Sequence, residues 1–306
     1  MELSNLTTEK RNPASINMDQ MTTMEILQII NNEDKTIAHS VEKVLPQIRV
    51  VTDQVVESIQ NGGRLFYVGS GTSGRIGMLD ASECPPTFMT PPELVQTVMA
   101  GGNEAFFQAV ENAEDNEAQG ELDLKDRNLT KHDVVIGITA SGRTPYPIGA
   151  IKYAKTIGAF TVGLSSNANS LINKYTDIAI EVVVGPEVLT GSTRMKAGTS
   201  HKMILNMIST TTMVKLGKVY RNLMVDVHAT NYKLMERAKS IIMDITNVSY
   251  ETAEYILTKT NYEIKPAIIM VQTKVDEQEA IVTLKRNGGD VGKAIQELLN
   301  KGVNDE

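Results

Sequence analysis

Two short loops carry hydroxyl groups, glycines and an arginine in a pattern that suits phosphate binding. The loop over 69–75 reads GSGTSGR and the loop over 139–144 reads TASGRT. Each follows an apolar run and precedes a helical stretch, and a helix start attracts anions through free N–H groups and its dipole. Helix capping is the alternative for either loop alone, but the repeat favours phosphate. The candidate binding residues are Ser70, Thr72, Ser73, Ser141, Gly142, Arg143 and Thr144.

The first loop also matches the G-x-G-x-x-G fingerprint of dinucleotide-binding proteins. That site needs a second strand that ends in an acidic residue about 20 residues later. Here residues 84–92 read CPPTFMTPP, and four prolines exclude a central strand. Residues 288–294 read GGDVGKA, which lacks the spacing and the Ser or Thr of a Walker loop. No nucleotide cofactor is therefore predicted.

Other chemistry-bearing side chains give weaker signals. Glu83 ends a predicted helix against a double proline, where the helix dipole disfavours a carboxylate. Glu114 lies in an acidic stretch that composition alone would place on a solvated helix face. Cys84 is expected to be a buried reduced thiol, and His201 a packed helix residue. One cysteine and four scattered histidines exclude a cysteine-based zinc site, so no metal is predicted.

The elements that position the two loops alternate between strands and helices. Apolar, β-branched or aromatic runs occur at 64–69, 133–139, 159–166 and 178–184, with helical stretches between them. This alternation predicts an α/β fold with a parallel sheet covered on both faces. A long helix is predicted between Gly198 and Gly217.

Helical segments flank this α/β region. Thr22 and Glu25 are spaced as a capping box, and a helix over 37–59 is expected to kink at Pro46. The last eighty residues predict a small appendage of three helices near 250–259, 276–286 and 290–300. The predicted division is an N-terminal helical segment (1–54), an α/β domain (55–218) and a C-terminal helical region (219–306).

Composition narrows the function further. The 306 residues include 30 Lys and Arg against 37 Asp and Glu, a formal net charge of −7, without basic blocks. This balance argues against nucleic-acid binding. No apolar run approaches the ~20 residues of a membrane span, and the polar N-terminus lacks a signal-peptide core. A reduced, cytoplasmic globular protein is expected.

Residues 69–88, GSGTSGRIGMLDASECPPTF, closely resemble the signature of the N-acetylmuramic acid 6-phosphate etherases. The similarity covers nearly the whole chain and includes TEKRN at 8–12, AVENAED at 109–115 and GPEVLTGSTRMKAGT at 185–199. It implies a sugar isomerase (SIS) domain over 55–218, a parallel-sheet three-layer sandwich that binds phosphosugars and usually dimerises. The C-terminal three-helix appendage would be UBA-like.

The resemblance also implies an activity. The family cleaves the D-lactyl ether of N-acetylmuramic acid 6-phosphate to N-acetylglucosamine 6-phosphate and D-lactate, without metal or redox cofactor, in cell-wall sugar recycling. Its two catalytic glutamates fall on Glu83 and Glu114. We expect Glu83 to protonate the departing lactate and Glu114 to remove the C2 proton, as in a carbon–oxygen lyase.

Two alternatives share the same domain. A phosphosugar aldose–ketose isomerase would release no lactate, and a non-catalytic phosphosugar sensor would have no use for both Glu83 and Glu114. For assembly, the amphipathic first helices predict burial against a second subunit, and hence a homodimer. Residues 8–12 are then expected to reach toward the partner's site, although a solvated tail is the alternative.

Overall fold

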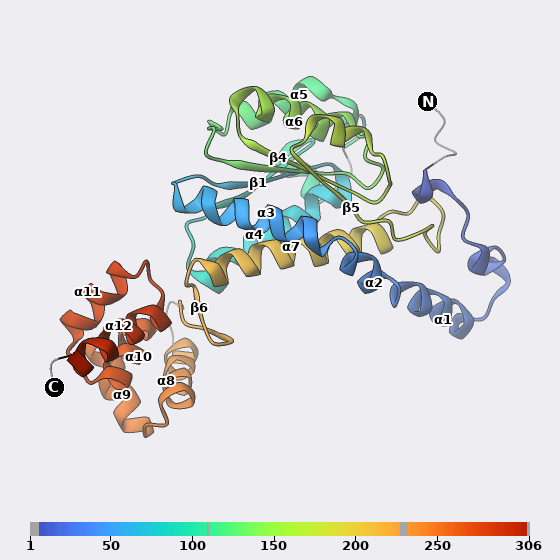
Figure 1. Ribbon diagram of the computed structural model, residues 1–306. Coiled ribbons are helices and arrows are strands. Elements are labelled where there is room, and N and C mark those ends of the chain that lie inside the picture. Colours follow the sequence, from blue (N-terminus) through green and yellow to red (C-terminus); the bar gives the residue numbers. More distant parts are fainter. Residues whose placement is uncertain (1–5, 109, 227–231, 305–306) are drawn as a thin grey trace. The chain divides into compact units, whose positions relative to one another are not determined.

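The computed structural model describes residues 6–108, 110–226 and 232–304 (Figure 1). The chain divides into two compact units. Unit 1 comprises Met1–Ser82 and Pro92–Ser209, and unit 2 comprises Glu83–Pro91 and Thr210–Glu306. The predicted N-terminal segment thus belongs to unit 1, and the predicted boundary after residue 218 falls inside unit 2.

Unit 1 is built on a five-stranded sheet in the order β2-β1-β3-β4-β5. Every neighbouring pair of its strands is parallel, so all the carboxyl ends meet at one edge. Four of the strands, β1 to β4, are largely buried, as expected where helices cover both faces of a sheet, whereas the edge strand β5 is mostly half-buried. The strands are β1 (Leu65–Gly69), β2 (Val95–Met99), β3 (Val134–Ile138), β4 (Phe160–Ser165) and β5 (Ile178–Glu181).

The prediction of the sheet is confirmed for β1, β3, β4 and β5, but it missed β2. This strand begins three residues after Pro92 and forms an edge of the sheet. The prolines exclude a strand only where they stand, and the short VQTVM sequence beyond them pairs with β1 along a single side.

Two helical layers complete a three-layer sandwich (Figure 1). Helices α5 (Glu117–Lys125) and α6 (Pro145–Ile157) cover one face. Helices α3 (Leu45–Gln60), α4 (Gly71–Phe88) and α7 (Lys196–Lys215) cover the other.

Glycines on one side of α4 let its backbone approach the sheet. A Cβ at Gly77 would lie 2.9 Å from the Cβ of Tyr67, and one at Gly74 would lie 2.9 Å from the carbonyl oxygen of Gly69. Only glycine fits at these contacts without displacing the helix. The first turns of α4 are therefore held tightly against β1.

The N-terminal residues form three 3-10 turns, η2 (Thr7–Glu9), η3 (Pro13–Ser15) and η4 (Met18–Gln20), followed by α1 (Thr23–Asp34). The predicted capping box is present, because Thr22 and Glu25 satisfy each other's backbone N–H groups. The expected kink at Pro46 is wrong. The chain forms two helices, α2 (Ile37–Glu42) and α3, and Pro46 stands in the first turn of α3, where no N–H is needed.

Unit 2 contains a short hairpin of β6 (Val219–Tyr220) and β7 (Leu223–Met224), followed by helices around one apolar core. The three expected helices are present as α9, α11 and α12, but they share this core with α8 and α10. The appendage is thus part of a larger helical unit. The helices are α8 (Tyr232–Thr246), α9 (Tyr250–Lys259), α10 (Ile264–Thr273), α11 (Glu277–Arg286) and α12 (Val291–Asn304).

Candidate active site

The first predicted phosphate loop joins β1 to α4. Gly71 has φ +53°, so the chain turns sharply into the helix, and the N–H groups of Ser73 and Gly74 bond to the carbonyl of Ser70. The Ser70 hydroxyl oxygen is buried and has no hydrogen-bond partner among the described residues. A buried polar atom without a partner is costly. The start of α4 therefore offers both a dipole and an unused hydroxyl to an anion.

The second predicted loop joins β3, the neighbour of β1, to α6. Its hydroxyls form a cluster, in which Thr139 Oγ1 lies 2.8 Å from Thr144 Oγ1 and 3.3 Å from Ser141 Oγ. Ser141 Oγ also accepts the N–H of Arg143 at 3.2 Å. Because β1 and β3 are adjacent and parallel, both loops lie at the same edge of the sheet. The prediction that the two loops follow strands of one sheet is thus confirmed.

Gly142 shapes the second loop through its backbone. It has φ +71°, and a Cβ there would lie 2.3 Å from the Cβ of Ser170. Any other residue would be strained and would collide with its neighbour. Gly142 thus forms the turn of the second loop, and its predicted contact with phosphate stays a prediction.

A cavity of about 260 Å³ brings Glu114 together with the first loop. Ser70 and Gly71 line it from one side, and Glu114 lines it from the connection between β2 and α5. Glu114 stands in the 3-10 turn η6 (Ala113–Asp115), which follows Asn112 at φ +60°. Glu114 is exposed, as composition suggested, but it stands in a 3-10 turn and not on a helix face, and it lines a cavity beside the candidate anion site.

Glu83 stands near the end of α4, the helix whose start forms the first loop. It is exposed and belongs to unit 2, and it is not among the residues that line the 260 Å³ cavity. The helix was expected to end at Glu83, but it continues through Pro85 and Pro86 to Phe88. The two prolines have no N–H to donate to the carbonyls four residues earlier, so this part of α4 lacks two helical hydrogen bonds.

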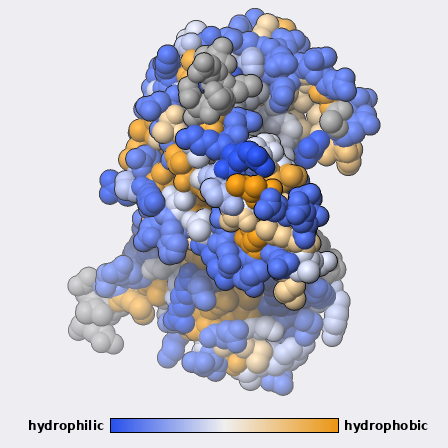
Figure 2. All heavy atoms as spheres, turned by 90° about the vertical axis from the view of Figure 1, so that its right-hand side faces the viewer, coloured by the Kyte–Doolittle hydropathy of each residue, from blue (hydrophilic) through white to orange (hydrophobic). Residues whose placement is uncertain are grey.

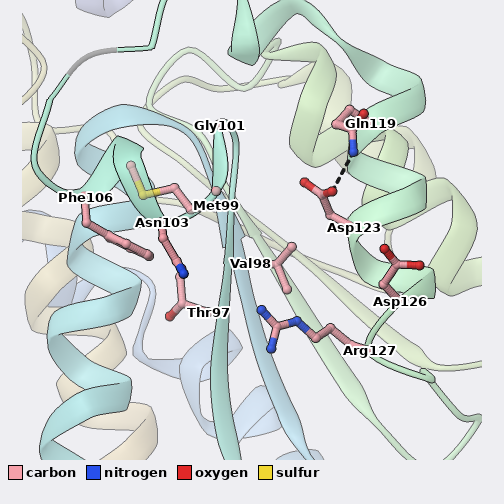
Figure 3. A pocket seen from close by; sticks show the side chains of 11 residues that line it. Thr97, Val98, Met99, Gly101, Asn103, Phe106, Gln119, Asp123, Asp126 and Arg127 are labelled. Carbon is pink, nitrogen blue, oxygen red and sulfur yellow. Dashed lines mark hydrogen bonds between the residues drawn. The ribbon is translucent and has the colours of Figure 1, made fainter.

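A second cavity, of about 410 Å³, lies beside the free edge of β2 (Figure 3). Thr97 and Met99 line it from the strand, and Asp123 and Arg127 line it from the end of α5. None of the residues predicted for the site takes part in its lining. The 3-10 turn η5 (Gly102–Phe106) stands between the two cavities, with Ala105 facing the smaller one and Phe106 the larger.

The N-terminal segment packs against its own chain near the second loop. Asn167 accepts the N–H of Thr7 at 2.7 Å and donates to Thr8 Oγ1 at 3.1 Å and to the carbonyl of Ala140 at 3.0 Å. Asn12 is 4% exposed and donates to a carbonyl in the loop after β5. Thr8 and Asn12 are therefore not part of a solvated tail, and the expected reach of residues 8–12 toward a partner stays a prediction.

Three buried side chains near this edge were not predicted to act in the site. One is Asn167, which holds the N-terminal segment. Another is Glu187, which is 0% exposed and accepts the N–H groups of Lys196 and Ala197 at the start of α7. Lys196, 2% exposed, pairs with Glu33 of α1. Nothing in their spacing marks them, because their partners lie 9 or more residues away in the chain. For Glu187 and Lys196, the only available signal is the long motif over 185–199.

His201 is a packed helix residue, as predicted. It is 1% exposed, its Nε2 lies 3.0 Å from the Ser166 hydroxyl, and burial lowers its pKa to about 4. The imidazole is therefore neutral near pH 7. Cys84, the single cysteine of the sequence, is a buried thiol, also as predicted. The described part of the chain contains no group of three or more His, Cys, Asp or Glu side chains that could hold a metal ion, and no helix in it could span a membrane.

Family models match three parts of the chain. Residues 47–155 match the N-terminal SIS domain of glucokinase regulatory protein, residues 108–210 match the SIS domain, and residues 221–288 match the C-terminal lid domain of glucokinase regulatory protein. A phosphoheptose isomerase from Francisella tularensis has a similar structure, with a TM-score of 0.51 and 18% identity over 63% of this chain and 100% of that chain. These matches confirm the predicted SIS-type α/β fold.

Curated relatives are similar over nearly the full length. An N-acetylmuramic acid 6-phosphate etherase of Clostridium beijerinckii is 54% identical over 301 residues, which cover 98% of this chain and 99% of the relative. The protein of the same name in Bacillus subtilis is 54% identical over 296 residues, with 97% of each chain covered.

Proposed function

This chain belongs to the N-acetylmuramic acid 6-phosphate etherase family, and on that premise we propose that it converts N-acetylmuramic acid 6-phosphate to N-acetylglucosamine 6-phosphate and D-lactate. The reaction serves the recycling of cell-wall amino sugars. One observation links the proposal to particular residues. The unpartnered hydroxyl of Ser70 and the carboxylate of Glu114 line the same cavity at the start of α4. An anion site beside a base is the arrangement that proton abstraction from a phosphosugar requires.

The reaction is best described as an elimination followed by addition of water, which makes the enzyme a carbon–oxygen lyase. In the open-chain sugar, the C1 aldehyde makes the C2 proton acidic. A base removes that proton, the electron pair forms the C2=C3 double bond, and the C3–O bond breaks. An acid protonates the departing oxygen, which leaves as D-lactate. Water then adds its oxygen to C3 and a proton to C2.

We assign the base to Glu114 and the acid to Glu83. Glu114 lines the same cavity as the first loop. A substrate anchored on that loop by its phosphate would therefore present its carbon chain to this carboxylate. The role of Glu83 rests on its match to a catalytic glutamate of the family, and its side chain is exposed near the end of α4. The phosphate is remote from the reacting bonds, so its binding energy can position C2 and C3. This chemistry needs no metal or redox cofactor.

If Ser73 donates a hydrogen bond to the phosphate, as proposed, then Ser73→Ala should weaken the binding of phosphorylated sugars selectively. A hydrogen bond to a charged group is worth ~1.5–3 kcal/mol, so the loss of the hydroxyl should weaken binding of a sugar phosphate by roughly 10- to 100-fold. Binding of the unphosphorylated sugar should change little. Titration calorimetry with N-acetylglucosamine 6-phosphate and with N-acetylglucosamine measures both effects. Equal losses for the two sugars would remove Ser73 from the phosphate site.

A direct assay separates the proposed activity from the two alternatives. The purified protein is incubated with N-acetylmuramic acid 6-phosphate, and D-lactate is measured with a lactate dehydrogenase. The etherase releases one lactate for each sugar consumed. An aldose–ketose isomerase would change the sugar without releasing lactate, and a sensor would bind the sugar unchanged. Either of these results would reject the proposed function.

We further propose a homodimer, with α1 in its interface. No residue of α1 is buried, and Met24 and Leu27 are 71% and 55% exposed. Figure 2 looks onto the side from which α1 projects in Figure 1 and shows hydrophobic side chains exposed among hydrophilic ones. Leu27→Glu should shift a dimer to a monomer in light scattering, whereas Asn32→Asp, which adds a charge on the side of α1 away from Leu27, should not. A monomeric wild-type protein would contradict this assembly.

The proposed compartment is the cytoplasm. A phosphorylated sugar does not cross a lipid bilayer unaided, and a chain with a single cysteine cannot form an internal disulfide, which suits a reducing environment. Cell fractionation with an antibody to the protein tests this assignment.

A further inference from the structure

Arg75 belongs to the first loop motif, where an arginine suggests a contact with phosphate. Its side chain instead bonds to the protein backbone. Its guanidinium donates to three backbone carbonyls of the connection between β2 and α5. Nη2 bonds to Ala105 at 2.8 Å and to Gln108 at 3.3 Å, and Nε bonds to Phe106 at 3.3 Å. An arginine spread over several carbonyls fixes a backbone segment, because its planar fork holds the acceptors in one geometry.

The segment that Arg75 holds leads directly to Glu114. Hydrogen bonds within it are local, since Phe107 and Gln108 both donate to Glu104. The connection also folds back on itself, because a Cβ at Gly101 would lie 2.9 Å from the Cβ of Val110. Gly101, Gly102 and Asn112 have positive φ, so the path of this connection depends on residues in the left-handed region. Contacts that fix Ala105–Gln108 therefore also limit where Glu114 can stand.

Arg75 and Glu114 line the same cavity. Arg75 lies one turn after Gly71 on α4, and Gly74 and Gly77 press this part of the helix against the sheet. Arg75 thus joins α4, whose start is the candidate phosphate site, to the segment that precedes the proposed base. Catalysis by a positioned base is sensitive to such contacts, since an error of about 1 Å can cost on the order of 10²-fold in rate.

We propose that Arg75 is a positioning residue of the etherase reaction: it fixes Ala105–Gln108 and thereby holds Glu114 at the C2 proton of a substrate anchored on the first loop. This inference rests on the proposed function. It assigns to Arg75 no contact with the phosphate, although arginine in a hydroxyl-rich loop would suggest one.

The kinetic test compares Arg75→Lys and Arg75→Gln with Arg127→Gln. A lysine ammonium keeps the charge but cannot span three carbonyls, so both Arg75 variants should lose on the order of 10²-fold in kcat. Their KM should stay within about threefold of the wild-type value. Arg127→Gln, a change at an arginine that lines the 410 Å³ cavity, should leave both constants unchanged. Circular dichroism checks that each variant is folded.

A second kinetic readout isolates the step that Glu114 performs. Exchange of the C2 hydrogen of N-acetylglucosamine 6-phosphate with deuterium from solvent should fall in the same ratio as kcat in both Arg75 variants. A rise in KM of tenfold or more with kcat preserved would instead show that Arg75 binds the phosphate, and it would overturn the proposal. Full rates in Arg75→Lys would overturn it as well, because charge alone would then suffice.

A structural readout remains informative if the protein proves not to be an etherase. Amide hydrogen exchange, followed by mass spectrometry, measures protection of peptides that cover 104–116 in wild-type protein and in Arg75→Lys. The substitution should speed exchange in these peptides and leave those over β3 and β4 unchanged. Unaltered exchange over 104–116 would show that Arg75 does not hold the connection, whatever reaction the protein performs.

Discussion

Glu83→Ala is expected to abolish D-lactate release while the protein still binds N-acetylglucosamine 6-phosphate. The ether oxygen is a poor leaving group unless it is protonated, and a positioned acid contributes ~10²–10⁴-fold in rate. Glu83 is not among the residues that line the cavity of the first loop, so its removal should leave the anion site intact. Calorimetry measures the retained binding, and a lactate assay measures the lost turnover.

A substrate analogue distinguishes an acid from a merely structural residue. If the C3 substituent is replaced by a group that leaves without protonation, such as fluoride, Glu83→Ala should eliminate it at a rate close to that of the wild-type protein. Glu83→Gln, which preserves the size of the side chain, should behave in the same way. If the analogue reacts as slowly as the lactyl ether in both variants, Glu83 is not the acid.

Glu114→Gln is expected to stop the reaction one step earlier. The amide keeps the shape of the side chain but cannot accept the C2 proton, so both lactate release and C2 hydrogen exchange should fall by ~10²–10⁴-fold. The two glutamate variants should therefore differ in their rate of C2 hydrogen exchange. Glu83→Ala should still exchange the C2 hydrogen with deuterium, whereas Glu114→Gln should not. Nuclear magnetic resonance in deuterium oxide measures this exchange.

The opposite pattern would reverse the assignment of roles. If Glu114→Gln exchanges the C2 hydrogen and accepts the activated analogue while Glu83→Ala does neither, then Glu83 is the base. Glu111→Gln serves as a matched control, because Glu111 also lines the cavity but has no assigned step. Its effect on both measurements should be small.

The sheet could be predicted because its strands carry their own signal. The runs that became β1, β3 and β4 are buried on both faces, so their composition is apolar almost throughout, and the half-buried β5 still reads as an apolar run. The edge strand β2 has only five residues and follows a proline-rich stretch, so its local pattern does not predict an extension of the sheet. Prolines also hide the true end of α4, because the helix continues through Pro85 and Pro86, where local propensity predicts a stop.

The candidate site was only partly predictable, for a physical reason. A loop between a strand and a helix is local, so the two hydroxyl-rich loops could be found by inspection. Glu114 reaches its cavity through a 3-10 turn whose entry depends on the positive φ of Asn112, and no periodicity encodes such a turn. The roles of Arg75 and Asn167 depend on acceptors more than twenty residues away in the chain, which a reading of local patterns does not reach.

The division of the chain also has a consequence for biosynthesis. Unit 2 takes its first piece, Glu83–Pro91, from the early part of the chain and the rest from Thr210 onward. Ribosomes add about 5–20 residues per second, so this piece leaves the ribosome many seconds before its partners exist. During translation, unit 1 can assemble around a helix whose last turns still lack the helical unit to which they belong. The proposed acid, Glu83, thus becomes part of its finished unit only when the C-terminal helices have been made.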